Sequence, residues 1–204
     1  GMQFVTLQED WTIRGQAFKT GDLLAFDLKQ FLDTKEMPPL DLVFRANERQ
    51  AVNGVVVSKT AALLSINDNV VGKILRLEHD SEAGWTTTDV ALPGTGQAGI
   101  AFANDDEDTV FVNYEGCLSP DSLLTFDAET NTTEARKSLP AKFDAEGLTV
   151  QQMEATSTDG TKIPYFIVHR EDITLDGSTP TLLYGYGGFN VSMRPSYSGG
   201  IGRM

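Results

Sequence analysis

The hexapeptide Leu123-Leu124-Thr125-Phe126-Asp127-Ala128 decides the fold, because two variants of it occur earlier in the chain. All three begin with an apolar pair and continue with a spacer, a large apolar residue and an acidic residue. They start at residues 23, 74 and 123, so the intervals between them are 51 and 49 residues. A pattern that recurs at a nearly fixed period predicts an array of repeated structural units.

Each repeated unit contains about four short β-like runs separated by turn residues. The runs that accompany the hexapeptide are 55–57, 63–66 and 85–92 in the second unit and 100–102, 110–112 and 132–139 in the third. Four strands per unit at this period are typical of the blades of a β-propeller. The sequence therefore predicts about three blades: residues 4–48, which are irregular and contain a Pro-rich insertion, then 49–93 and 94–140.

Three blades are too few to close a propeller ring, which needs about four to eight. The array is therefore expected to stay open, and open sheet edges favour pairing with a partner or with a second copy. Helical periodicity is nearly absent from the chain. The one helix that the sequence predicts lies at residues 28–33, just before Met37-Pro38-Pro39.

The pattern changes after residue 140. Two alternating runs, 148–156 and 162–169, are joined by a segment that contains Asp159-Gly160, and Asp-Gly is a strong signal for a hairpin turn. A polar linker then leads to the apolar run 180–184, which predicts a third, buried strand. The chain is thus predicted to be mainly β, with incomplete propeller blades in residues 1–147 and the first strands of a second domain in 148–204.

Composition limits the classes of partner. The chain has 16 basic and 29 acidic residues, a formal net charge of −13, which argues against nucleic acid and anionic membranes. Cys117 is the single cysteine, so no internal disulfide can form. Gly1 before Met2 suggests a tag-cleavage remnant, so the natural N-terminus is expected elsewhere. The compartment is left open between cytoplasm and periplasm.

Three other motifs have some features of ligand sites. The run Gly94–Gly99 matches G-x-G-x-x-G, but a strand-like run rather than a helix follows it, so we interpret it as a connection between blades and not as a dinucleotide site. The acidic runs 67–69 and 105–108 read as hairpin turns, with calcium binding as the alternative. We therefore expect no cofactor and no metal.

The stretch Leu182-Leu183-Tyr184-Gly185-Tyr186-Gly187-Gly188-Phe189-Asn190 indicates part of a catalytic site. The sequence predicts an apolar strand that runs into a bend at Gly185, Gly187 and Gly188, where a positive φ costs little. A donor placed by a strand at a glycine-flanked bend is how α/β-hydrolases build an oxyanion hole. The chain contains no G-x-S-x-G nucleophile motif.

Residues 158–169 (TDGTKIPYFIVH), 175–178 (LDGS) and 183–190 (LYGYGGFN) together resemble the start of the catalytic domain of prolyl oligopeptidases. The resemblance is dense over 148–198, and over 1–147 it rests on blades that lead into that domain. It implies a serine peptidase in which a propeller caps an α/β-hydrolase domain. Such enzymes cleave short proline-containing peptides on the carboxyl side of proline.

The resemblance also implies residue roles. Tyr186 matches the tyrosine that donates its phenol hydroxyl into the oxyanion hole, and Phe189 matches an aromatic residue that lines the substrate pocket. The family's Gly-Gly-Ser-Asn-Gly-Gly segment, with the nucleophilic serine, is absent here, and so are its later aspartate and histidine. His169 and Asp172 belong to the hairpin region and do not replace them.

Two interpretations follow. In the first, the chain corresponds to an internal piece of a serine oligopeptidase and has no peptidase activity alone, because the nucleophile and base are missing. In the second, it is a non-catalytic β-rich interaction module, or a truncated product that associates with itself through its open blade edges.

Overall fold

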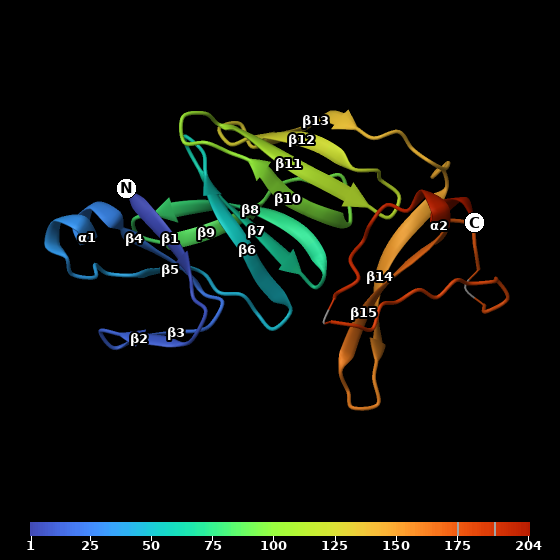
Figure 1. Cartoon of the computed structure of the whole chain (residues 1–204), viewed down its shortest axis with the longest axis horizontal. Coiled ribbons are helices and arrows are strands. Elements are labelled where there is room, and N and C mark those ends of the chain that lie inside the picture. The colour runs from blue at the N-terminus through green and yellow to red at the C-terminus, as the bar shows by residue number, and fades with distance from the viewer. Residues whose placement is uncertain (175, 190) are drawn as a thin grey trace.

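Strands dominate this computed structural model, which describes residues 1–174, 176–189 and 191–204 (Figure 1). Leu175 and Asn190, both part of the family motifs, lie outside the described residues. The elements are β1 (Met2–Thr6), β2 (Trp11–Ile13), β3 (Gln16–Phe18), β4 (Leu23–Asp27), α1 (Leu28–Thr34), β5 (Asp41–Phe44), β6 (Gln50–Val57), β7 (Ala62–Asp68), β8 (Val71–Asp80), β9 (Gly84–Asp89), β10 (Gly96–Phe102), β11 (Thr109–Gly116), β12 (Ser122–Asp127), β13 (Thr132–Ser138), β14 (Leu148–Thr156), β15 (Lys162–Arg170) and α2 (Gly199–Arg203).

The second and third units are four-stranded antiparallel sheets, with strand orders β6-β7-β8-β9 and β10-β11-β12-β13. The repeated hexapeptide falls on the third strand of each sheet, β8 and β12. Among the described residues the sheets stay open and do not form a closed ring. The predicted blades are thereby confirmed, and we call these sheets the second and third blades.

The first unit is less regular, as its sequence predicts. Its main sheet has three strands in the order β1-β4-β5, and β2 and β3 form a separate hairpin. The predicted helix is α1, which begins after Asp27, whose carboxylate accepts hydrogen bonds from the backbone N–H groups of Lys29 (2.8 Å) and Gln30 (3.2 Å). A carboxylate at this position satisfies N–H groups that have no partner inside the helix.

The core lies between neighbouring sheets. Leu63 and Leu64 are adjacent on β7 and point to opposite faces of the second blade, as strand geometry requires. Leu63 packs in a cluster with the third blade that includes Val112 and Phe126, whereas Leu64 packs toward the first unit, beside Leu23. Burial on both faces explains why β7 is apolar in consecutive positions rather than in alternate ones.

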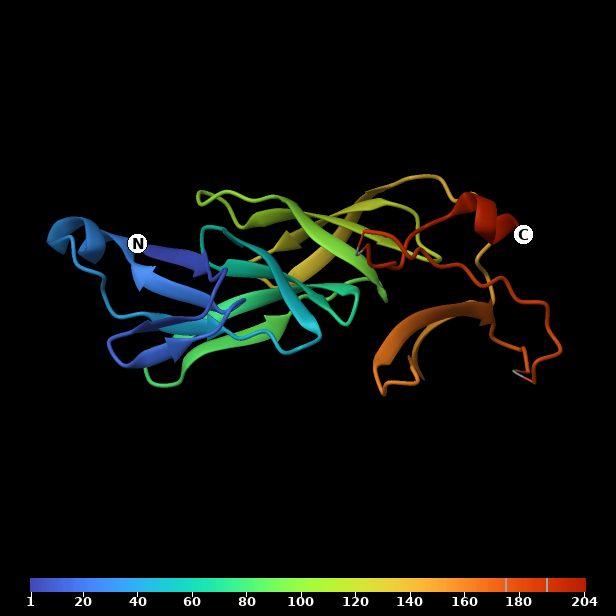
Figure 2. The same cartoon turned by 60° about the horizontal axis from the view of Figure 1, so that its bottom comes forward.

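The predicted hairpin of the second region is confirmed. Strands β14 and β15 pair from Leu148 with Arg170 to Thr156 with Lys162, and Gly160 takes a φ of 87° in the turn. The hairpin also contacts the second blade: the Gln152 side-chain amide donates to the Asn69 carbonyl (2.6 Å). Figures 1 and 2 show the hairpin and the C-terminus at one end of the molecule and the first unit at the other.

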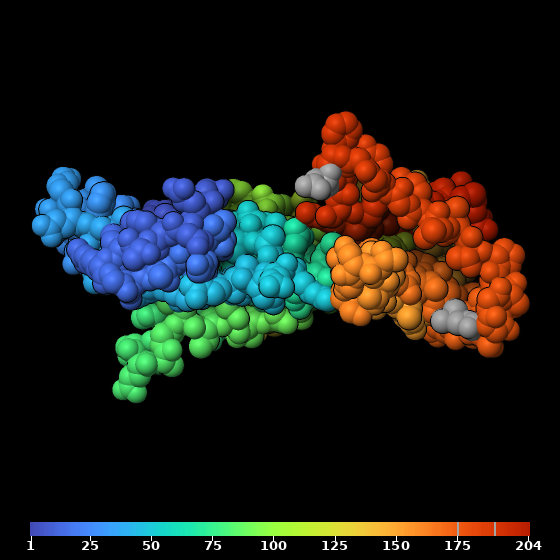
Figure 3. All heavy atoms as spheres, turned by 90° about the horizontal axis from the view of Figure 1, so that it is seen from below, coloured from blue at the N-terminus to red at the C-terminus, as the bar shows by residue number. Residues whose placement is uncertain are grey.

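The third strand predicted at residues 180–184 is wrong for this structure. The segment has no regular secondary structure, and Leu183 is 94% exposed. A strand needs a neighbour to bond its backbone groups, and among the described residues the second region offers only the two-stranded sheet β14-β15, which does not extend to this segment. The space-filling view in Figure 3 shows the chain after β15 spread over the surface of this end of the molecule.

Helix α2 was not predicted. Its sequence contains three glycines, which are poor helix formers. The helix begins after Ser198, whose hydroxyl accepts the Ile201 backbone N–H (3.3 Å). Contacts with Lys142 and Phe143, which are far away in the sequence, accompany this helix.

Candidate functional site

The segment between β15 and α2 carries the predicted site residues. Tyr186 is 51% exposed, so its phenol is accessible from solvent. Its ring lies over Gly188, where an added Cβ would meet the Tyr186 hydroxyl oxygen at 3.4 Å. A backbone hydrogen bond from Val191 N–H to the Gly188 carbonyl (3.1 Å) closes a turn just after the tyrosine. Tyr186 therefore stands at the entrance of a tight turn.

The bend differs in detail from the sequence prediction. Gly185, Gly187 and Gly188 do not take a positive φ, whereas Phe189 does, with a φ of 54°. A left-handed backbone is unusual for an aromatic residue. The three glycines therefore do not adopt the positive φ angles that the sequence led us to expect. At Gly188 an added Cβ would make ordinary van der Waals contact with the Tyr186 ring, so the close approach of this ring does not require the glycine.

Phe189 is 95% exposed, so its ring contacts almost none of the described residues. A pocket wall needs other side chains around it, and none encloses this ring in the described part of the chain. The role of Phe189 in lining a substrate pocket therefore stays a prediction, as do the roles of Tyr186 and the bend.

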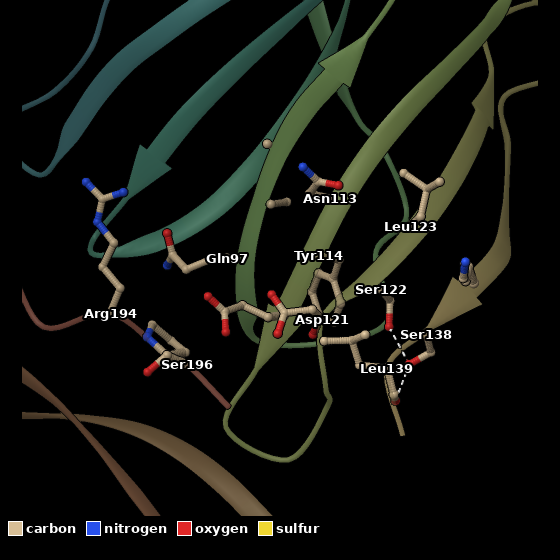
Figure 4. Close-up of a pocket in the computed structure, with 15 residues that line it drawn as sticks. Gln97, Asn113, Tyr114, Asp121, Ser122, Leu123, Ser138, Leu139, Arg194 and Ser196 are labelled. Carbon is tan, nitrogen blue, oxygen red and sulfur yellow. Dashed lines mark hydrogen bonds between the residues drawn. The ribbon is translucent and has the colours of Figure 1, made fainter. Parts of the chain in front are cut away.

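A cavity of about 810 Å³ lies between the third blade and residues 194–196 (Figure 4). Arg194 and Ser196 face it from the C-terminal segment, and Asn113, Ser122 and Lys137 belong to the strands on its other side. Tyr186 and Phe189 do not line this cavity. The cavity and the predicted oxyanion site are therefore separate features of the same end of the molecule.

The C-terminal segment returns to the third blade after the site. Pro195 is fully buried, and the Tyr197 backbone N–H donates to the Glu115 carboxylate on β11 (3.1 Å). Sequence reasoning did not single out these residues. Glu115 and Tyr197 are separated by 82 positions, and no local pattern connects residues that far apart.

His169 and Asp172 are not arranged as a catalytic pair. His169 Nδ1 lies 2.7 Å from the Arg170 carbonyl oxygen, and the Asp172 carboxylate accepts from Arg170 Nε at 3.1 Å. The hydrogen bond and charge of Arg170 lower the pKa of Asp172. These contacts agree with the exclusion of both residues from the catalytic group.

Two observations concern other classes of site. Within residues 1–174, 176–189 and 191–204, no three His, Cys, Asp or Glu side chains gather closely enough to hold a metal ion. In the same ranges, no helix has the length and apolar character needed to cross a membrane.

Comparison with known proteins identifies related peptidases. The chain is 42% identical to an uncharacterized peptidase of Sinorhizobium fredii over 206 aligned residues. This alignment covers 100% of this chain and 28% of the Sinorhizobium protein. It is 31% identical over 123 residues to a prolyl endopeptidase of Elizabethkingia miricola, covering 60% of this chain and 17% of the relative. No family model matches the chain.

The solved structures that resemble this chain are also peptidases. A post-proline cleaving enzyme from Rickettsia typhi superimposes with a TM-score of 0.72 and 31% identity, over 97% of this chain and 28% of that one. Prolyl oligopeptidase B from Galerina marginata gives a TM-score of 0.70 and 25% identity, over 88% of this chain and 25% of that one. The chain thus spans 28% of the length of the Sinorhizobium fredii protein and 28% of the Rickettsia typhi chain. Sequence and fold together show that it belongs with the prolyl oligopeptidase family, as a relative of one segment of those longer proteins.

Proposed function

We propose that this chain is part of a longer serine peptidase that cleaves short peptides on the carboxyl side of proline. The observation that carries the proposal is the order of its parts: propeller blades run directly into a hairpin and then into the segment with Tyr186. The relatives named as prolyl endopeptidases and the post-proline cleaving enzyme support the same reaction class.

In this proposal Tyr186 stabilises the oxyanion that forms when a serine attacks the peptide carbonyl. A phenol has a pKa near 10 and stays protonated at neutral pH, so it can donate a hydrogen bond without ionising. Its position at the entrance of a turn, with an accessible hydroxyl, suits a donor that must meet a substrate. Phe189 is the proposed side wall of the substrate pocket, to be completed by residues outside this chain.

The 204-residue chain alone is proposed to be inactive. Acyl transfer needs a nucleophile activated by a base, and the sequence motifs that hold both in this family are absent from these residues. A hydroxyl donor alone cannot form the acyl-enzyme intermediate. Any proline-specific hydrolysis by the purified chain that Tyr186→Phe abolishes would contradict this point.

The experiment compares two tyrosines in the longer protein that contains this sequence. Tyr186→Phe removes one oxyanion donor and is expected to lower kcat by about 10²–10³-fold on a blocked Gly-Pro anilide. Tyr184→Phe is the matched control, because Tyr184 lies two positions away and is also exposed, at 64%. We expect Tyr184→Phe to stay within about twofold of the wild type. Equal rates for the wild type and Tyr186→Phe would refute the assignment.

The open sheets favour a second candidate function, a non-catalytic interaction module. The motivating observation is the exposed apolar run at Leu182, Leu183 and Tyr184, which has no strand beside it in the described part of the chain. Exposed apolar segments with unpaired backbone groups tend to pair with another chain. Sedimentation of the 204-residue chain from low to high micromolar concentration tests this function, and a monomer throughout would exclude self-association.

A further inference from the structure

The segment that carries Tyr186 and Phe189 is fixed at its far end by a group of contacts that we call the anchor. The anchor consists of Glu115 on β11, Lys142 and Phe143 on the linker before β14, and Tyr197, Gly202 and Arg203 near the C-terminus. It joins three parts of the chain that are distant in sequence.

Tyr197 is the centre of the anchor. Its ring stacks on Phe143, with centroids 5.1 Å apart and an interplanar angle of 12°. Its hydroxyl oxygen accepts the Lys142 backbone N–H (2.6 Å), and its own backbone N–H donates to the Glu115 carboxylate (3.1 Å). One residue therefore contacts both the third blade and the linker.

Helix α2 contacts the same linker, at Lys142 and Phe143. Arg203 Nε donates to the Lys142 carbonyl (2.8 Å), so both backbone groups of Lys142 are bonded to the C-terminal segment. At Gly202 an added Cβ would lie 2.6 Å from Phe143 Cγ, closer than real Cβ atoms approach. The glycine thus lets the helix backbone reach the Phe143 ring.

The C-terminal segment contains a fully buried residue close to the anchor. Pro195 is fully buried, although the chain before it is exposed. Burial raises the pKa of the Cys117 thiol, which lies beside the Ser196 backbone. The segment is thus exposed at residues 191–194, fully buried at Pro195 and half-buried at residues 197–199.

From this geometry we propose that Tyr197 is a positioning residue for Tyr186. The strip formed by the described residues 171–174, 176–189 and 191–194 lies between the end of β15 and the anchor, so the anchor fixes one of its two ends. Releasing that end would let Tyr186 move relative to the third blade. A misplacement of about 1 Å can cost up to about 100-fold in rate, because a donor must meet the oxyanion at hydrogen-bond distance. This catalytic consequence rests on the proposed function, whereas the anchor itself does not.

The first experiment tests the anchor in the 204-residue chain by hydrogen exchange. Tyr197→Ala removes the stacking ring and the acceptor for the Lys142 amide, so we expect that amide and the Gly202 amide to exchange at least about tenfold faster. Tyr197→Phe keeps the ring and should accelerate only the Lys142 amide. Tyr165→Phe, a change to a tyrosine on β15, is the matched control and should alter neither. Unchanged exchange in Tyr197→Ala would overturn the proposal.

The second experiment tests positioning by kinetics in the longer protein. We expect Tyr197→Phe to lower kcat about tenfold with little change in KM, because only a transition-state contact is misplaced. In a Tyr186→Phe background the same change should cost nothing further, since Tyr197 acts through Tyr186. Additive losses, or an unchanged kcat, would refute positioning. If the wild-type longer protein cleaves no peptide, the proposed function fails, while the exchange result still decides the anchor.

Discussion

The close approach of the second and third blades makes Gly72→Ala the most informative test of the propeller-like packing. Gly72 lies on β8, and an added Cβ there would stand 3.1 Å from the Ala98 carbonyl oxygen and the Gln97 carbonyl carbon, and closer still to the Ala98 nitrogen. Ordinary contacts begin at 3.4 Å. All three atoms belong to the backbone of β10, which cannot rotate away as a side chain can. The two sheets must therefore separate.

Overpacking of this kind typically costs about 1–3 kcal/mol, and we expect about 2 kcal/mol for Gly72→Ala. With an m-value of about 2 kcal/mol per M of urea, the unfolding midpoint should fall by about 1 M. Gly54→Ala on β6 is the matched control, because nothing lies within 4 Å of its added Cβ and a strand glycine usually costs about 0.5–1 kcal/mol relative to alanine. Equal midpoints for the two variants would show that the blades do not pack as the structure describes.

Two further changes test the first unit and the exposed strip. Asp22 is 1% exposed and accepts two hydrogen bonds from Arg45 (2.8 and 2.6 Å), which lower the pKa of Asp22. Because the Arg45 left behind is half-exposed, we expect Asp22→Ala to cost about 2 kcal/mol at pH 7, from the lost hydrogen bonds to the charged group. Because the folded-state pKa lies below the unfolded one, this stabilisation is complete above the unfolded pKa of about 4. It is lost as the pH falls through the folded pKa, so urea unfolding of both proteins below pH 4 should show a smaller difference; a pH-independent gap would contradict the ion pair. Leu183→Ser should change the unfolding free energy of the 204-residue chain by less than about 0.5 kcal/mol, because this side chain is 94% exposed, and a larger loss would mean that Leu183 is buried.

The blades could be predicted from the sequence because each is a local structure. In the third blade every strand pairs with its neighbour in sequence, β10 with β11, β11 with β12, and β12 with β13. Such a meander depends on short turns and alternating residues, which a sequence displays directly. The hairpin β14-β15 followed from its Asp-Gly turn for the same reason.

The site segment could be predicted only in part, because its structure depends on partners that are distant in sequence. The apolar run 180–184 has the composition of a buried strand, yet it becomes one only beside another strand. In helix α2 the local sequence and the structure disagree in the opposite direction. Its glycine-rich sequence disfavours a helix, yet a helix forms, and it contacts Lys142 and Phe143. In both places the tertiary environment outweighs local preference.

The position of the proposed oxyanion donor also depends on tertiary contacts more than on local sequence. Tyr186 was identified by its motif, but a motif does not show what holds a side chain in place. In the structure the strip that carries it has no sheet partner among the described residues, and the contacts that fix its far end are those of Tyr197 with Glu115, Lys142 and Phe143. Glu115 belongs to a blade and Lys142 to the linker between the regions. We therefore expect the position of the proposed donor to be coupled to the blade array, so that changes in the third blade reach the site through Tyr197.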